Sequence, residues 1–310
     1  MQQRKFIHYF IISLKGMAMG AADVVPGVSG GTIAFISGIY EELLSCISAV
    51  NFSTLKQLKK EGIKSAWKTI NGNFLIALII GIFTSILSLA KLISWLLEHK
   101  PILVWSFFFG LVLASVLYIG KQITKWNNIA IIGLLVGAGL AYYITTLQPL
   151  ISENPSPLFL FLAGALAICA MILPGISGAF ILVLLGAYKP VLEAIHNKDL
   201  KIIAVLAFGA VVGLLSFSRV LKWLFNNYKN YTLVVLTGFI LGSLNKIWPW
   251  KETLTWHINS HGIKVPFNQQ SISPFSFEGD SQLAMAILLA IVGFAIIILL
   301  EKIANSTNKI

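Results

Sequence analysis

The chain has 310 residues, of which 57% are hydrophobic and only 11% are charged, and its formal net charge is +11. Soluble globular proteins carry about 25% charged residues, so this composition excludes a water-soluble enzyme. Long apolar runs and a mean hydropathy of +0.83 are typical of a polytopic membrane protein.

The net charge and the spacing of the cysteines further restrict the partners and metals that this protein could bind. A basic excess indicates nucleic-acid binding in a soluble protein, but in a membrane protein it reflects Lys and Arg held in cytoplasmic loops beside anionic lipid. We therefore expect membrane lipids as partners and no nucleic acid. Cys46 and Cys169 lie in apolar runs without metal-ligand spacing, so no metal is expected. No cofactor motif or Walker A loop occurs, which argues against direct use of ATP.

In chain order, the apolar segments are of two kinds. Those of about 20 residues are long enough to span a bilayer at 1.5 Å per residue. These predicted transmembrane helices are 74–97, 102–120, 129–147, 202–225, 231–247 and 282–303. The other segments are shorter and flank breaks that contain Pro and Gly. The stretch 158–172, for example, reaches only about 22 Å as a helix, against about 30 Å of hydrocarbon.

The two breaks carry almost no charge. The first reads VVPGVSGG from position 24, and the second reads ILPGISGA from position 172. Irregular backbone at membrane depth is tolerated only inside protein or along a wet cavity. We therefore favour two re-entrant helical hairpins, at 6–47 and 158–195, whose PGxSG tips are broken at Pro26 and Pro174. The alternative is two ordinary spans joined by a tight turn.

Lys and Arg orient the chain. They cluster at the N-terminus, in the 48–73 loop, at 121–125, at 222–229 and near the C-terminus. If the first hairpin returns to its own side, all of these clusters fall on one face, which the positive-inside rule makes cytoplasmic, with both termini on it. The Trp-rich segment 248–281 then lies on the opposite face, either as an interfacial cap or as a lid over an outer opening.

An internal repeat is visible. Residues 16–47 align without gaps on 164–195, and 74–115 align on 202–243. Identities in the first block include Gly16/Gly164, Pro26/Pro174, Gly27/Gly175, Ser29/Ser177, Gly30/Gly178, Gly38/Gly186 and Tyr40/Tyr188. Apolar composition alone would not match Pro, Tyr and several Gly in order, so we interpret the pattern as a duplication.

The number of crossings between the two motifs is odd, so the second copy is predicted to be inverted. Inverted repeats with broken helices at their interface are the architecture of secondary transporters. The predicted fold is therefore an all-α polytopic membrane protein with two inverted-topology repeats, 1–150 and 151–310. Each repeat consists of a re-entrant hairpin followed by three transmembrane helices.

The tips are candidate anion sites. A helix that restarts after a Gly-rich break presents free N–H groups and the positive end of its dipole, which suits a phosphate or carboxylate. The candidate phosphate-binding residues are Gly27, Ser29, Gly30, Gly31 and Thr32 of the first tip and Gly175, Ser177 and Gly178 of the second. The alternative is that these residues only permit helix breakage and close packing.

Three charged residues inside apolar segments complete the candidates. Lys91 and Arg219 occupy corresponding positions in the two copies. They are predicted either to capture or steer a phosphate or simply to snorkel towards the membrane surface. Asp23 precedes the first tip and has no counterpart, so it is either a proton-coupling group or a helix cap. No residue is predicted to be catalytic.

The segments GMAMG from Gly16, AADVVPGVSGGT from Ala21 and LPGISG from Leu173 resemble the bacterial polyprenyl-phosphate transporter family. The resemblance extends from about residue 10 to residue 303. It implies a multi-pass protein of the bacterial plasma membrane that flips undecaprenyl phosphate from the outer to the cytoplasmic leaflet. This would return the lipid carrier of cell-wall synthesis to the cytoplasmic leaflet. During alternating access, the phosphate would lie between the two tips.

Two other functions remain open. Undecaprenyl-pyrophosphate phosphatases also combine inverted repeats with re-entrant hairpins, but their PGxSRS-like tip carries an arginine. Here Ser29 is followed by two glycines and Ser177 by Gly178, so no arginine is available to stabilise a phosphoryl transition state. A transporter of a small anion is the third class.

Overall fold

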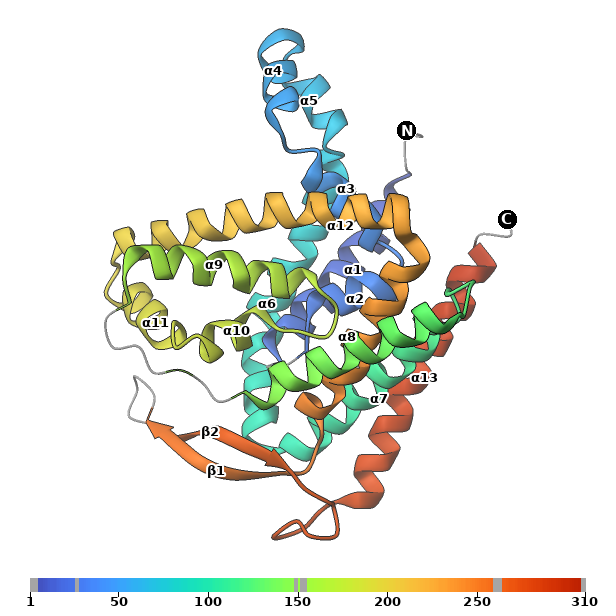
Figure 1. Ribbon diagram of the computed structural model, residues 1–310, viewed down its shortest axis with the longest axis vertical. Helices are drawn as coiled ribbons and strands as arrows, with labels where there is room; N and C mark the ends of the chain where they lie inside the picture. Colours follow the sequence, from blue (N-terminus) through green and yellow to red (C-terminus); the bar gives the residue numbers. More distant parts are fainter. Residues whose placement is uncertain (1–4, 26–27, 148–149, 151–154, 259–263, 308–310) are drawn as a thin grey trace.

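The structure is a computed structural model that describes residues 5–25, 28–147, 150, 155–258 and 264–307, and it is mostly helical (Figure 1). The elements are α1 (Phe6–Val24), α2 (Gly30–Ile36), α3 (Tyr40–Ser48), α4 (Phe52–Glu61), α5 (Ile63–Thr69), α6 (Gly72–His99), α7 (Pro101–Gly120), α8 (Asn128–Thr146), α9 (Pro157–Ile172), α10 (Gly178–Leu184), α11 (Tyr188–His196), α12 (Leu200–Ser243), the 3₁₀ turn η1 (Leu244–Ile247), β1 (Lys251–Ile258), β2 (Lys264–Ser271) and α13 (Leu283–Thr307).

Several helices are suited to a membrane. Among the described residues, four are long and apolar enough to cross one, namely α6, α7, α8 and α12 with η1. The pair α10 and α11 meets the same test only as a unit bent by 107° at its break. The helix α9 and the apolar part of α13 are shorter. The chain is therefore a polytopic helical membrane protein, as its composition predicts.

The spans expected at 202–225 and 231–247 are both helical, and inside α12 they meet directly at a kink, which Figure 1 shows as a sharp turn. Tyr228, with φ −135° and ψ 40°, is the non-helical residue at the bend. The polar run around it contains no Pro or Gly, so nothing in the sequence forces the helix to end. Side chains stabilise both sides of the bend, because Asn227 Nδ2 donates to Trp223 O and Thr232 Oγ1 donates to Tyr228 O.

The helices pack in pairs: α1 against α6, α9 against the first part of α12, α7 against α13, and α8 against the second part of α12. Glycines allow each approach, because a Cβ at these positions would meet a facing carbonyl oxygen. The contacts recur in matched register. They are Gly16 to Leu78 and Gly164 to Leu206, Gly81 to Ser13 and Gly209 to Phe161, Gly110 to Ala290 and Gly238 to Leu134, and Gly137 to Val235 and Gly293 to Phe107. The correspondence seen in the sequence thus extends to α8 and α13.

The segment expected to be an irregular cap or lid contains an antiparallel hairpin, β1 paired with β2. Its alternating Thr, Trp, Val and Phe residues fit a two-stranded ribbon, so the protein is not purely helical. Figure 1 shows this hairpin and the helical pair α4–α5 at opposite ends of the molecule. Five lysines lie on α4–α5: Lys56, Lys59, Lys60, Lys64 and Lys68. The lysine cluster of α4–α5 and the hairpin β1–β2 therefore lie at different ends of the molecule.

Candidate functional site

The first break separates α1 from α2. The helix α1 ends at Val24, and α2 begins at Gly30 with Ser29 as its N-cap. Ser29 Oγ accepts a hydrogen bond from the backbone N–H of Gly31 at 3.1 Å, which is the interaction expected of a capping serine. All seven residues of α2 are buried. Pro26 and Gly27 lie outside the described residues.

The second break separates α9 from α10. The helix α9 ends at Ile172, and Ser177 is the N-cap of α10 without a side-chain cap hydrogen bond. Gly175 has φ +92°, a conformation that side-chain-bearing residues rarely adopt. A Cβ at Gly175 would also lie 2.9 Å from Ser243 Oγ. Pro174 is fully buried. The tip therefore requires glycine for both its backbone angle and its packing against α12.

The two tips contact each other directly. Ser29 Oγ donates to Met171 O at 2.9 Å, and the backbone N–H of Gly175 donates to Thr32 Oγ1 at 2.9 Å. Ser29 and Thr32 are each only 1% exposed. The first tip thus supplies partners for a carbonyl at the end of α9 and for a backbone N–H of the second tip. The structure brings together the two motifs that the sequence singles out.

Glycines set the spacing between the tips. A Cβ on Gly31 would lie 2.5 Å from Ile172 O and 2.8 Å from Met171 O. A Cβ on Gly178 would lie 2.6 Å from the carbonyl oxygen of Ala167. All three distances are too short for any side chain, because each facing atom belongs to the backbone. Close packing is therefore a role that these glycines do perform.

Asp23 lies against the start of α2. Its Oδ1 accepts a hydrogen bond from the backbone N–H of Gly30 at 2.7 Å. The carboxylate thus occupies the position at a helix N-terminus that an anion favours. The geometry agrees with the helix-cap interpretation, and it also places a carboxylate where it would compete with any bound phosphate.

Lys91 and Arg219 are not brought to the tips. Lys91 is exposed on α6, and Arg219 is exposed on α12. Arg219 Nη2 donates to the carbonyl oxygen of Val50, in the segment between α3 and α4, at 2.8 Å. Their similar placement matches their corresponding positions in the sequence, but neither is among the described contacts of the two motifs.

Two polar residues at the site were missed by the sequence analysis. Tyr40 OH donates to Ile172 O at 3.1 Å, so it adds a third hydrogen bond between the first hairpin and the second tip. Lys15 Nζ, on α1, donates to Ser37 O at 2.6 Å, at the end of α2. The identity of Tyr40 with Tyr188 across the repeat was a signal for the first residue. Lys15 in an apolar segment was a signal for the second.

The comparisons with known proteins agree on one family. A family model described as undecaprenyl phosphate translocase-like matches residues 19–265. A polyprenyl-phosphate transporter of Vibrio cholerae is 53% identical over 305 residues, covering 97% of this chain and 99% of the relative. A polyprenyl-phosphate transporter of Staphylococcus aureus is 32% identical over 278 residues, covering 84% and 92%. No solved structure matches the chain.

Proposed function

The chain belongs to the undecaprenyl phosphate translocase-like family, and from this premise we propose that it carries undecaprenyl phosphate from the outer to the cytoplasmic leaflet of the bacterial plasma membrane. The phosphate headgroup crosses through the protein while the isoprenoid tail stays in lipid. The reaction is transport without covalent chemistry, and it returns the lipid carrier to the side on which cell-envelope precursors are made.

The observation that supports this proposal most is the direct contact between the two tips. Ser29 and Thr32 reach the segment 171–175 through buried hydrogen bonds. A packing contact alone needs no hydroxyl groups, because small apolar residues pack equally closely. Hydroxyl and backbone N–H groups are ligands that a phosphate accepts. The same groups would therefore exchange a partner in the other tip for phosphate oxygens.

We propose that the two halves, 1–150 and 151–310, are inverted repeats that alternate access to this site. The matched glycine contacts of α6 with α1 and of α12 with α9 support this proposal. In such transporters the substrate site lies at the repeat interface near the midplane, at the ends of broken helices. Moving one hairpin relative to the other opens the site to one leaflet and closes it to the other.

In this conformation the donors of the first tip are occupied internally. The N–H of Gly30 donates to Asp23, and the N–H of Gly31 donates to Ser29. Phosphate binding to these groups requires the carboxylate to withdraw, and protonation of Asp23 removes the charge that opposes the phosphate. Asp23 is accordingly our proposed proton-coupling residue. Gly27 and Ser177 complete the proposed ligand set. The exposure of Lys91 and Arg219 favours steering of the anion over direct contact with the bound phosphate.

We place both termini in the cytoplasm. The lysines of α4–α5 support this orientation by the positive-inside rule. In Figure 1 the first turns of α1 and the last turns of α13 lie towards the same edge of the molecule, away from β1 and β2. The β-hairpin then faces the outer leaflet.

The test is transport by purified protein in liposomes that contain fluorescent undecaprenyl phosphate. An impermeant quencher added outside reports how much lipid remains in the outer leaflet. We expect faster loss from that leaflet than in empty liposomes, and a further change under an imposed proton gradient. Equal rates in both preparations would overturn the proposal. Release of inorganic phosphate from undecaprenyl pyrophosphate would instead indicate a phosphatase, and uptake of free phosphate would indicate a small-anion transporter.

A further inference from the structure

The outer end of the molecule is built around tryptophans that follow α12. Trp248 Nε1 donates to Ile272 O at 2.8 Å, and Trp250 Nε1 donates to Ser281 O at 2.9 Å. The rings of Phe109 and Trp248 meet edge to face at 5.3 Å. These contacts fix the segment after β2 against α7 and η1. The β-hairpin is therefore a positioned part of the protein and not a loose connection.

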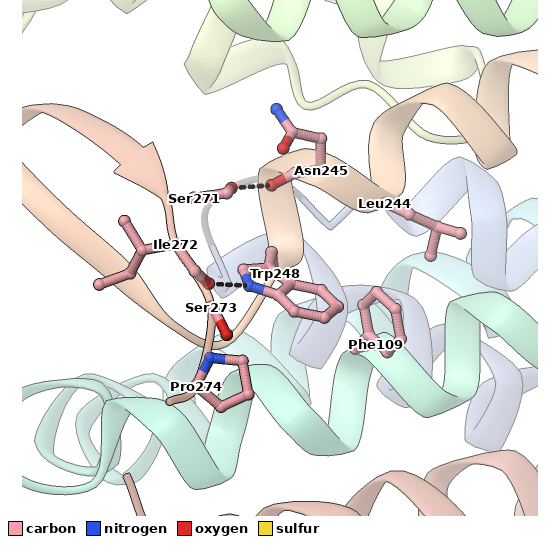
Figure 2. A pocket seen from close by; sticks show the side chains of 8 residues that line it. All are labelled: Phe109, Leu244, Asn245, Trp248, Ser271, Ile272, Ser273 and Pro274. Atoms are coloured by element: carbon pink, nitrogen blue, oxygen red, sulfur yellow. Dashed lines mark hydrogen bonds between the residues drawn. The ribbon is translucent and has the colours of Figure 1, made fainter. Parts of the chain in front are cut away.

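A cavity of about 560 Å³ lies beneath this segment, as Figure 2 shows. Its lining residues are Phe109, Leu244, Asn245, Trp248, Ser271, Ile272, Ser273 and Pro274. Aromatic and aliphatic side chains make much of the wall, Asn245 and Ser271 lie together, and Ser273 lies beside Pro274 (Figure 2). A cavity of this kind suits a ligand with a polar head and an apolar body.

Two lysines adjoin residues that line the cavity, because Lys246 follows Asn245 in the chain and Lys251 pairs with Ser271. Lys251 Nζ donates to Lys246 O at 2.6 Å and sits over the ring of Trp105 at 4.3 Å. Lys251 is paired with Ser271 in the β-ribbon, and Ser271 Oγ donates to Asn245 O, next to the carbonyl that Lys251 contacts. Directly paired side chains lie on the same face of a ribbon, so the ammonium group lies close to the cavity wall.

The next feature is the charge around these two lysines. Among the residues whose side chains are described, no carboxylate forms an ion pair with Lys246 or Lys251. Burial, together with the charge of Lys246, lowers the pKa of Lys251 to about 7. Withdrawing two like charges from water is costly unless an anion joins them. A doubly charged anion bound next to the two lysines would therefore compensate their positive charge.

The second lysine connects this cluster to the second tip. Lys246 Nζ sits over the ring of Phe180 at 4.3 Å. Phe180 belongs to α10, whose N-cap is Ser177. Gly175 of the same tip packs against Ile240 and Ser243, at the end of α12 just before Lys246. Lys246 thus connects Asn245 of the cavity wall to α10, the helix that follows the second PGxSG motif.

We propose that Lys246 and Lys251 form a capture site for a phosphomonoester headgroup on the outer side of the protein, with the cavity holding the isoprene units next to the phosphate. This inference rests on the proposed function, which supplies the lipid and the orientation. A phosphomonoester carries about −1.5 to −2 charges near neutral pH, which matches two cations. Ser273 adds a hydroxyl group to the lining, and Trp248 and Phe109 provide the apolar wall.

The first test is binding to the purified full chain. The probes are geranylgeranyl phosphate, geranylgeraniol and inorganic phosphate, and the variants are Lys246→Gln and Lys251→Gln. Lys189→Gln is the matched control, because Lys189 is exposed on α11. We expect at least a tenfold weaker affinity for geranylgeranyl phosphate in either lysine variant and no change in the control. Equal affinity of the wild type for the alcohol, or unchanged affinity in both lysine variants, would overturn the site. Tight binding of inorganic phosphate alone would reassign it to the free anion.

Two further readouts separate capture from folding and from transport as a whole. Removing an uncompensated buried charge is expected to leave the thermal midpoint of Lys251→Gln unchanged or higher, whereas a structural lysine would lower it. In liposomes, the lysine variants are expected to need more lipid for half-maximal transport while reaching the wild-type maximum. Transport by the wild type with unaltered lipid dependence in both variants would overturn the capture site alone. Absence of transport in the wild type would overturn the proposed function instead.

Discussion

The backbone N–H of Gly175 donates to Thr32 Oγ1 at 2.9 Å, across 143 positions of the chain. Gly175 needs its left-handed backbone to direct this N–H towards α2, and Thr32 has its hydroxyl in the first turn of that helix. One hydrogen bond thus joins the two PGxSG motifs. This hydrogen bond can be tested by substitution of Thr32.

Thr32→Val keeps the shape of the side chain but removes the acceptor of this hydrogen bond. The buried N–H of Gly175 is then unpaired, and we expect a loss of about 1–3 kcal/mol in stability, together with slower transport. Thermal unfolding in detergent and the liposome assay measure the two effects. Thr32→Ser retains the hydroxyl and serves as the control. A Val variant as stable and active as the Ser variant would contradict the role assigned to Thr32.

Gly31→Ala tests the distance between the tips. The added methyl group would lie 2.5 Å from Ile172 O, so one hairpin must move away from the other. Such overpacking costs about 1–3 kcal/mol. The matched control is Gly139→Ala on α8, where a Cβ would meet nothing within 4 Å. We expect the first variant to unfold at lower temperature and to transport slowly, whereas the control behaves as the wild type. Identical behaviour of the two variants would count against close contact of the hairpins.

Asp23→Asn separates the two interpretations of this residue. The amide oxygen can still accept from the N–H of Gly30, so capping is preserved and the protein is expected to fold. The side chain can no longer take up a proton. If Asp23 couples protons to transport, the response of the liposome assay to an imposed proton gradient is lost. If that response persists in the variant, Asp23 acts only as a cap of α2.

Lys251 gives stability a defined dependence on pH. Burial lowers its pKa to about 7 in the folded protein, against an ordinary value of 10.5 for a lysine, so between these values the unfolded chain binds more protons than the folded one. Stability is therefore expected to rise with pH above about 7, by at most about 1.4 kcal/mol per pH unit. Thermal midpoints of the wild type and Lys251→Gln, compared from pH 6 to pH 9, measure this contribution as their difference. A constant difference would contradict it.

The affinity for a phosphomonoester should change with pH in the opposite direction to the stability. The ammonium of Lys251 must be charged to bind an anion, so affinity is expected to fall as pH rises through about 7. The charge of Lys246 acts on Lys251, and the segment after β2, which packs on Trp250, carries Glu278 and Asp280. α7 carries no charged residue, Glu252 is exposed and alternates to the other face of the strand, and Lys264 pairs with Ile258 at the far end of the ribbon. Affinity that stays constant from pH 6 to pH 9 would count against Lys251 as a ligand.

Much of the architecture could be predicted because a membrane imposes it. The apolar runs 74–97, 102–120 and 129–147 correspond closely to α6, α7 and α8, since a helix must satisfy its own backbone in lipid. The breaks near Pro26 and Pro174 were visible because Pro and Gly interrupt helices in any context. The spans 202–225 and 231–247 were also predicted as separate helices, and the kink at Tyr228 lies between them.

The local sequence therefore determined which segments are helical and where two of them are broken, and it predicted that the two breaks are copies of each other. These properties depend on periodicity, apolar length and backbone restriction, which neighbouring residues set. Only the tertiary structure decided that Thr32 meets Gly175, that Arg219 lies away from both motifs, and that Lys246 and Lys251 share one end of the molecule. Those relationships depend on how helices pack across long separations in the chain, where the close approach of glycines to facing carbonyls fixes the register.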